Sequence, residues 1–326
     1  MDEILALDKS VGRDISQTLH ATFKIYTPHL IAHSSSILST PRSTHPYGPD
    51  PRQLLDIYFP PSISPTIPNL TSTTPILIFL YGGGLILGNK VDPDIQDGLV
   101  YKNLGAFFAQ RGIVTVIPDY RRADSRFGGE GARYPSGGED VLLALKWVAQ
   151  ALGNGETARD VFLMGNSAGG VHVSTFLLAD EFAAERKLYC AGKGGVTLRG
   201  AVGLAVPFRF PEALGRGETL RNYYGSLEKA EERAPCGLLE RLKGRGSSME
   251  EAGVPRMRAL VGEFDPEDEI SGPTRHFVEL WGNTWGDGME FKVLKGHNHA
   301  SPAWALMAGE KEGELWAEDV VEWIKS

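Results

Sequence analysis

The segment VFLMGNSAGG, residues 161–170, joins an apolar run to the pattern G-x-S-x-G. Val161–Met164 is expected to form a buried strand, and a helix is expected to begin at Ser167. Glycines two residues before and after Ser167 permit a sharp turn that exposes the hydroxyl, because a Cβ at either position would collide with neighbouring backbone. The segment therefore predicts that Ser167 is a nucleophile.

Apolar strands alternate with helical patterns on both sides of this segment. The expected strands span 54–59, 75–80, 113–117, 198–206, 256–261 and 289–294, and the expected helices lie near 99–108, 138–152, 236–243, 272–281 and 316–323. This alternation predicts an α/β fold with a mostly parallel sheet that is covered by helices on both faces.

Two regions depart from the alternation. Residues 1–45 carry irregular apolar positions, and they are expected to form one or two short helices outside the main core, as an arm that contributes to a lid. The rest, 46–326, is expected to be one domain, with a polar, loop-rich lid insertion at about 207–254 and one helical piece inside it. The stretch 34–68 is rich in Ser, Thr and Pro, so it is expected to be loop apart from the strand at 54–59.

A glycine-rich loop, Tyr81-Gly82-Gly83-Gly84, directly follows the expected strand that ends at residue 80. Attack on an acyl carbon creates an oxyanion, which needs preorganised backbone N–H donors. The expected donors are the amides of Gly82 and Gly83, together with the amide of Ala168 after the nucleophile.

A serine nucleophile needs a base and an orienting acid, and in this class of sheet the chain order is Ser, Asp or Glu, then His. Asp265 lies just past the strand at 256–261 and is preferred, because Pro266 fixes the turn after it. Glu263, Glu267 and Asp268 are the competing acids.

The loop after the last expected strand supplies the base. It holds two histidines, and His299 is preferred over His297 because it lies immediately before the helix start at Ser301-Pro302. His172, on the helix after the nucleophile, is expected to be a packed core residue.

Composition limits the classes of function. A net charge of −8 argues against a nucleic-acid surface, and no apolar run reaches the ~18 residues that a membrane span needs. The first residues lack the pattern of a signal peptide, so a cytoplasmic location is expected. With two cysteines and no metal-ligand spacing, neither a disulfide framework nor a metal is expected. The oligomeric state stays open, with a homodimer among the alternatives.

The combination of these motifs resembles the hormone-sensitive-lipase-like branch of the α/β hydrolases. The matching features include the glycine-rich loop, the GNSAG turn, Gly262-x-x-Asp265-Pro266 and His299, and the resemblance covers roughly residues 50–325. It implies a carboxylesterase that acts on short to medium acyl esters or an acylated small molecule, with no metal and no organic cofactor. One departure is Tyr81, which stands where the branch usually has His; its phenol is expected either to hydrogen-bond backbone or to face the substrate.

The expected mechanism is a two-step acyl transfer to Ser167 and then to water, with His299 as base and Asp265 as its orienting acid. Aromatic residues predict an apolar substrate pocket, with Tyr81, Phe208, Tyr223 and Tyr224 as the binding residues. Two alternatives stay open: acyl transfer or condensation in a natural-product pathway with the same triad, and non-catalytic binding of a small molecule. The presence of His299 argues against the second.

Overall fold

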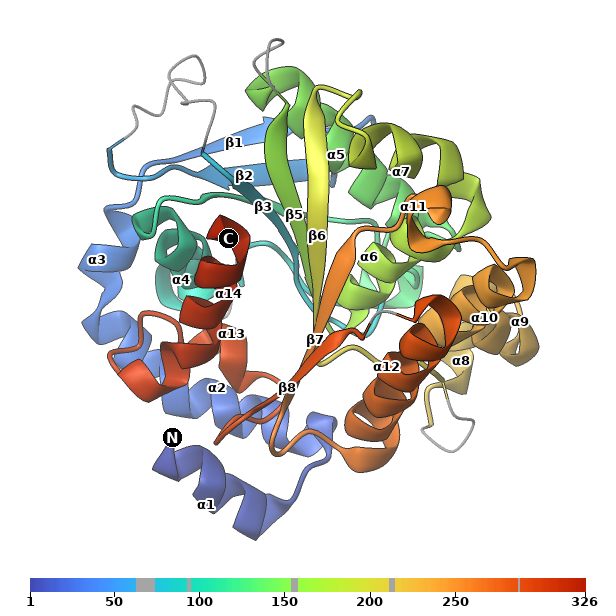
Figure 1. Ribbon diagram of the computed structural model, residues 1–326. Coiled ribbons are helices and arrows are strands. Elements are labelled where there is room, and N and C mark those ends of the chain that lie inside the picture. The colour runs from blue at the N-terminus through green and yellow to red at the C-terminus, as the bar shows by residue number, and fades with distance from the viewer. Residues whose placement is uncertain (63–73, 93–94, 154–157, 211–214, 287) are drawn as a thin grey trace.

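A computed structural model describes residues 1–62, 74–92, 95–153, 158–210, 215–286 and 288–326. It contains one eight-stranded sheet in the order β1-β2-β4-β3-β5-β6-β7-β8. Strands β3 to β8 run parallel to one another, β2 pairs antiparallel with β4, and β1 pairs antiparallel with β2. The predicted α/β fold with a mostly parallel sheet is thereby confirmed (Figure 1).

The strands begin and end as follows: β1 Arg42–Pro46, β2 Leu54–Tyr58, β3 Ile76–Leu80, β4 Val114–Pro118, β5 Arg159–Asn166, β6 Val196–Leu204, β7 Arg256–Gly262 and β8 Glu290–Leu294. The helices are α1 Asp2–Val11, α2 Ile15–Ala32, α3 Ser34–Leu38, α4 Leu99–Gln110, α5 Ser136–Leu152, α6 Ala168–Leu178, α7 Ala183–Cys190, α8 Gly217–Tyr224, α9 Leu227–Arg233, α10 Pro235–Arg245, α11 Met249–Ala252, α12 Gly272–Trp285, α13 Ser301–Ala305 and α14 Leu315–Lys325.

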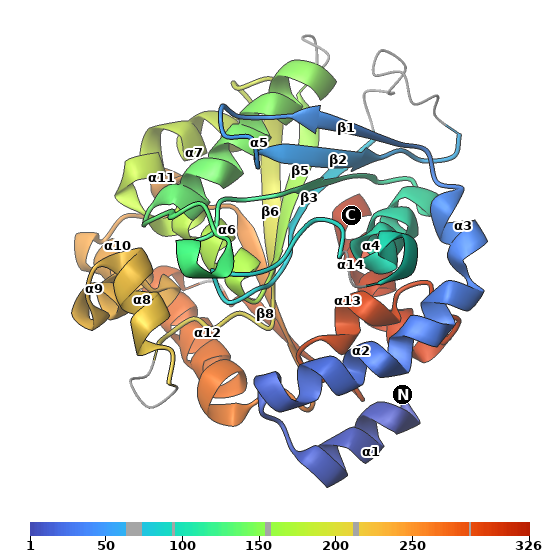
Figure 2. The ribbon, with the colours of Figure 1, turned by 180° about the vertical axis from the view of Figure 1, so that it is seen from behind.

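The central strands are buried on both faces. Every residue of β3 and of β4 is buried, as a continuous apolar run predicts for a strand covered on both sides. Helices α4 and α14 lie against one face of the sheet, and α5 and α6 lie against the other (Figures 1 and 2). The two layers of helices leave the carboxyl ends of the parallel strands free to carry functional groups.

Strand β1 lies in the stretch that was predicted to be loop. It is the edge strand of the sheet, and its residues alternate between exposed and half-buried. The sequence RSTHP carries no hydrophobic signal, as is common in an edge strand that pairs with a neighbouring strand on one side alone. Residues 63–68 of the predicted loop lie outside the described residues.

The N-terminal arm contains three helices rather than one or two short ones, and α2 is 18 residues long. The prediction that the arm lies outside the main core is wrong, because Tyr26 and Leu30 are buried in the main hydrophobic cluster. The buried face of α2 also contains Thr18 and Thr22. The hydroxyl of Thr22 donates to the Thr18 carbonyl at 2.8 Å, so this polar group is satisfied although it is buried. Because the buried face of α2 contains such polar residues, the hydropathy pattern of the sequence does not reveal it.

The stretch 207–254 is more helical than predicted. Its described residues, 207–210 and 215–254, hold four helices, α8 to α11, of which only α10 was expected. Residues 211–214 of this stretch lie outside the described residues. Helices α8, α9 and α10 form a small group beside α12 and α6 (Figure 1). No helix in the described part of the chain is long and apolar enough to cross a membrane.

Candidate active site

Ser167 occupies a strained turn between β5 and α6, with φ 50° and ψ −122°. The glycines around it are required by close packing. A Cβ on Gly165 would lie 2.5 Å from the backbone of Gly170, and one on Gly169 would lie 2.2 Å from the Leu80 carbonyl oxygen. Both distances are far below normal contact, so the turn that presents the serine excludes any side chain at these positions.

The structure brings Ser167, His299 and Asp265 together. His299 Nε2 lies 3.0 Å from Ser167 Oγ, and His299 Nδ1 lies 2.8 Å from Asp265 Oδ1. All three side chains are buried. A carboxylate can only accept a hydrogen bond, so Nδ1 of His299, which faces Asp265, carries the proton. Nε2 is then free to accept the hydrogen bond of the serine hydroxyl. This is the geometry that a serine nucleophile and its base require.

Strand register explains why residues so distant in sequence meet. Gly262, at the end of β7, pairs with Leu294, at the end of β8, so the two loops that follow leave the sheet side by side. The second carboxylate oxygen of Asp265 accepts the Gly262 N–H at 2.6 Å. This bond fixes the carboxylate so that its other oxygen faces His299.

The competing residues have other partners. The Glu263 carboxylate accepts the Gly296 N–H at 2.9 Å, and Glu267 pairs with Arg275. His297 is buried with Nδ1 3.0 Å from Ser301 Oγ, and burial lowers the pKa of its imidazole to about 4. His297 therefore shapes the loop.

Asn298 is a site residue that the sequence analysis missed. Its side-chain oxygen accepts the N–H groups of Ala300 and Ser301, at 3.2 Å and 3.0 Å. Its amide nitrogen donates to Thr22 Oγ1 of α2 at 2.7 Å. Helix α13 begins at Ser301, so these bonds hold His299 between a fixed helix start and the N-terminal arm. An Asn before a helix start is the available signal in the sequence.

The glycine-rich loop lies beside the nucleophile because Leu80 of β3 pairs with Gly165 of β5. Of the predicted amide donors, Ala168 lines the pocket next to Ser167, and neither Gly82 nor Gly83 is among the described residues that line it. Gly82 nevertheless lies beside the nucleophile, because a Cβ on Gly82 would be 3.2 Å from the Cβ of Ser167.

Gly84 is the residue of the glycine-rich loop that reaches the pocket. It lines the pocket with Ser167 and Ala168. Gly83 and Gly84 both have positive φ, at 144° and 59°, so the loop turns sharply at the two residues and brings Gly84 to the pocket. The Gly83 carbonyl accepts the N–H groups of Ile86 and Leu87 at 3.1 Å and 2.9 Å, which closes this turn.

Tyr81 does not face the pocket. Its side chain is fully buried, and its hydroxyl donates to Asp119 Oδ1 at 2.6 Å and accepts from Arg52 Nη2 at 3.0 Å. The same Arg52 nitrogen donates to the Gly88 carbonyl at 2.6 Å. The expectation that Tyr81 contacts substrate is therefore corrected: the phenol bonds to two half-buried charged residues, Asp119 and Arg52, behind the glycine-rich loop.

The other three aromatic residues predicted to bind substrate are also packing residues. Phe208 stacks on Phe277 with ring centroids 4.1 Å apart, and the Tyr223 hydroxyl accepts the Gly137 N–H at 3.0 Å. Tyr224 is buried against Tyr223 in a small second cluster. None of the three is among the described residues that line the pocket. Aromatic composition could not separate these roles, because packing uses the same surface as binding.

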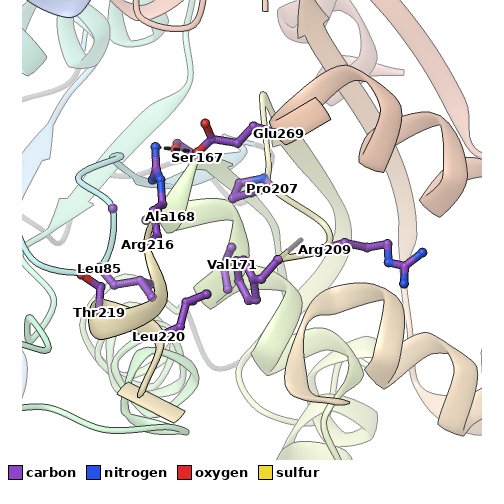
Figure 3. A pocket seen from close by; sticks show the side chains of 12 residues that line it. Leu85, Ser167, Ala168, Val171, Pro207, Arg209, Arg216, Thr219, Leu220 and Glu269 are labelled. Atoms are coloured by element: carbon purple, nitrogen blue, oxygen red, sulfur yellow. Dashed lines mark ion pairs between the residues drawn. The ribbon is translucent and has the colours of Figure 1, made fainter. Parts of the chain in front are cut away.

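The pocket beside Ser167 has a largely apolar wall and one ion pair. The described residues that line it are Gly84, Leu85, Ser167, Ala168, Val171, Pro207, Arg209, Phe210, Arg216, Thr219, Leu220 and Glu269. Arg216 and Glu269 meet beside Ser167 at 2.5 Å, whereas Arg209 points away and pairs with Glu231 at 2.7 Å (Figure 3). The described ranges contain no group of three or more His, Cys, Asp or Glu side chains able to hold a metal ion.

The chain is similar to known carboxylesterases over part of its length. The model of the Carboxylesterase family matches residues 54–190. Mouse carboxylesterase 1D is 32% identical over 129 residues, which cover 38% of this chain and 20% of that protein. Probable carboxylesterase 13 of Arabidopsis thaliana is 26% identical over 202 residues, covering 53% of this chain and 58% of that protein. The matches thus span about a fifth and just over half of these two relatives.

Solved structures are similar over most of the chain. A hyperthermophilic esterase from the archaeon Pyrobaculum calidifontis superposes with a TM-score of 0.58 at 16% identity, covering 93% of each chain. Carboxyl esterase 2 from the fungus Tuber melanosporum gives a TM-score of 0.59 at 16% identity, covering 88% of this chain and 86% of that one. These likenesses show that the chain has the α/β-hydrolase fold.

Proposed function

We propose that this protein hydrolyses carboxylic esters through an acyl-enzyme intermediate on Ser167. The observation that carries the proposal is the Ser167–His299–Asp265 chain of contacts, 3.0 Å and 2.8 Å long. The family match over 54–190 supports it, since that range includes the nucleophile turn and the glycine-rich loop.

In the first step His299 Nε2 takes the hydroxyl proton as Ser167 Oγ attacks the acyl carbon. Asp265 keeps the other ring nitrogen protonated and stabilises the imidazolium that forms. The amide of Ala168 and those of the Gly83-Gly84 turn are the proposed donors to the oxyanion. His299 then gives its proton to the leaving alcohol, and water repeats the sequence to release the acid.

Two further assignments belong to this proposal. The motifs around Tyr81, Ser167, Asp265 and His299 support membership of the hormone-sensitive-lipase-like branch. We also propose that the stretch 207–254 and the N-terminal arm act as a lid, because Arg216 and Leu220 line the pocket and Asn298 bonds to α2.

Hydrolysis of p-nitrophenyl esters by the purified protein and two variants tests the function. Ser167→Ala is expected to lose activity by at least about 10⁴-fold, in line with the removal of a triad nucleophile. Ser174→Ala is the matched control. It removes a buried hydroxyl of α6, the helix that follows Ser167, and this hydroxyl has no hydrogen-bond partner in the described structure. Full activity of Ser167→Ala would refute the proposal. Incorporation of ¹⁸O from water into the acid separates hydrolysis from acyl transfer.

A further inference from the structure

Arg52 lies on the connection between β1 and β2, behind the glycine-rich loop, and its side chain is only 11% exposed. Its guanidinium lies near two carboxylates, those of Asp119 at 3.7 Å and Glu130 at 3.5 Å. It also donates four hydrogen bonds, whose acceptors are the Tyr120 carbonyl at 2.7 Å, Asn89 Oδ1 at 3.0 Å, the Tyr81 hydroxyl at 3.0 Å and the Gly88 carbonyl at 2.6 Å. A single side chain outside every catalytic motif therefore joins segments on both sides of the glycine-rich loop.

The bond to Gly88 leads to the nucleophile through close backbone packing. A Cβ on Gly88 would lie only 2.6 Å from the Gly82 carbonyl oxygen, so the two glycines pack directly against each other. Gly82 in turn packs beside the nucleophile, since a Cβ on it would lie 3.2 Å from the Cβ of Ser167. Because both contacts are close, a displacement of Gly88 would displace the backbone beside Ser167.

The bond to Tyr120 leads to the same place by a second route. The Tyr120 side chain is fully buried, and its ring stacks on that of Tyr81 with centroids 4.8 Å apart. Its hydroxyl donates to the Tyr81 carbonyl at 3.0 Å and also lies 3.2 Å from the Gly82 carbonyl. Arg52 thus holds the Tyr120 backbone, and the Tyr120 side chain holds the start of the glycine-rich loop.

The chemistry explains why this loop needs outside support. The donors to an oxyanion must be in place before the charge develops. Gly83 and Gly84 both have positive φ, and glycine imposes little conformational restriction of its own. The position of their amides therefore depends on how the ends of the loop are held, and Arg52 bonds to Tyr81 at one end and to Gly88 at the other.

We propose that Arg52 is a positioning residue for the reaction at Ser167, because it holds the glycine-rich loop in the conformation that presents its amides to the oxyanion. This inference rests on the proposed ester hydrolysis and adds to it a residue that does not touch the substrate. A purely structural arginine would stabilise the fold and leave the reaction at each folded active site unchanged.

The test compares Arg52→Ala and Arg52→Lys with the parent on p-nitrophenyl acetate. Active sites are counted by the p-nitrophenolate that a p-nitrophenyl alkylphosphonate releases at the end point of labelling, so unfolded protein does not affect the rate per site. Arg52→Lys keeps the charge, but its ammonium cannot replace a planar fork that reaches four acceptors. We expect kcat/KM per active site to fall at least about tenfold in both variants, and less than the roughly 10²–10³-fold that loss of a whole oxyanion donor costs.

A second readout separates positioning from stability. A trifluoromethyl ketone adds Ser167 Oγ to its carbonyl carbon and forms an oxyanion, so its inhibition constant is expected to rise by the same factor by which kcat/KM falls. Arg258→Ala is the matched control, since that arginine is 9% exposed and bonds to Glu290 and Asp319 rather than to the glycine-rich loop. This control is expected to lower the urea midpoint and to keep kcat/KM per active site within twofold.

The outcomes distinguish this inference from the proposed function. Arg52 variants that keep kcat/KM per active site within twofold, or that bind the trifluoromethyl ketone as tightly as the parent does, overturn the positioning role while ester hydrolysis stands. If Arg52→Ala does not fold, the same criteria apply to Arg52→Lys. A parent that hydrolyses no ester overturns the proposed function itself.

Discussion

Replacing Tyr81 by phenylalanine removes one hydroxyl from below the glycine-rich loop and leaves the ring in place. The ring stacks on Tyr120 with centroids 4.8 Å apart, and phenylalanine keeps that contact. The lost hydroxyl bonds to two charged side chains, Asp119 at 2.6 Å and Arg52 at 3.0 Å. The variant therefore tests whether this link between loop and ionic network supports the reaction.

The structure sets the size of the effect. A hydrogen bond to a charged group contributes about 1.5–3 kcal/mol. Asp119 Oδ1 still accepts the Lys90 N–H at 2.6 Å, and Arg52 still donates to the Gly88 carbonyl, so neither charge is left unpaired. We therefore expect the free energy of unfolding to fall by about 1.5–2 kcal/mol. Loss of a whole oxyanion donor costs about 10²–10³ in kcat, so a loosened loop is expected to cost about tenfold.

Urea unfolding and p-nitrophenyl acetate kinetics measure the two effects. Tyr47→Phe is the control. The Tyr47 hydroxyl also bonds to Asp119, since it donates to the backbone carbonyl of that residue at 2.6 Å, but it is not part of the glycine-rich loop. This control is expected to lose stability and keep kcat. If Tyr81→Phe loses stability but keeps kcat within twofold, the reasoning about loop support is refuted.

Three other predictions follow from buried groups. Gly169→Ala places a Cβ 2.2 Å from a backbone oxygen of β3 and is expected to lower the free energy of unfolding by about 3 kcal/mol or more. Its control is Gly282→Ala in α12, where the space around the Cβ is open, and this variant is expected to stabilise the protein by about 0.5–1 kcal/mol. Thermal unfolding measures both. Asn298→Ala removes the hydrogen bonds made by both the oxygen and the nitrogen of a buried side-chain amide. We expect the free energy of unfolding to fall by about 2–3 kcal/mol and kcat to fall as well. An unchanged kcat would contradict the role of Asn298 in positioning His299. Burial lowers the pKa of His172 to about 3 and of His297 to about 4. The unfolded chain therefore binds these protons first, and stability falls as the pH drops below 6.5, by about 2 kcal/mol per histidine at pH 5; equal urea midpoints at pH 7 and pH 5 would count against this.

The sequence predicted those features whose cause is local. The turn at Ser167 depends on the glycines two residues before and two residues after it. The strand 76–80 is apolar along its whole length, and the strand 114–118 is apolar except for Thr115. The order of Ser167, Asp265 and His299 follows from where the strands end. Residue type and spacing contain all of this information.

The features that the sequence did not predict depend on contacts between distant segments. Tyr81 could be read as a substrate contact because its partners, Arg52 and Asp119, are 29 and 38 residues away. The loop amides of Gly82 and Gly83 were chosen from position alone. The residue of this loop that lines the pocket is Gly84, which follows a turn at two glycines with positive φ. Phe208 and Tyr224 look the same in sequence whether they bind a ligand or pack in a core.

The pocket itself was the least predictable part. Its ion pair joins Arg216 to Glu269, 53 positions apart in numbering, and neither residue belongs to a motif. An arginine and a glutamate in polar stretches are ordinary surface residues until the fold brings them beside the nucleophile. Part of the pocket wall is therefore formed by residues that carry no sequence pattern.

Covalent labelling with a fluorophosphonate tests the central claim most directly. The reagent phosphonylates an activated serine, and intact-mass and peptide mapping locate the adduct. The triad geometry predicts one adduct per chain, on the peptide that contains Ser167, and a rate of labelling that falls at least 100-fold in His299→Ala. An adduct on another residue, no adduct, or equal labelling of His299→Ala would contradict the assignment of Ser167 as a nucleophile activated by His299.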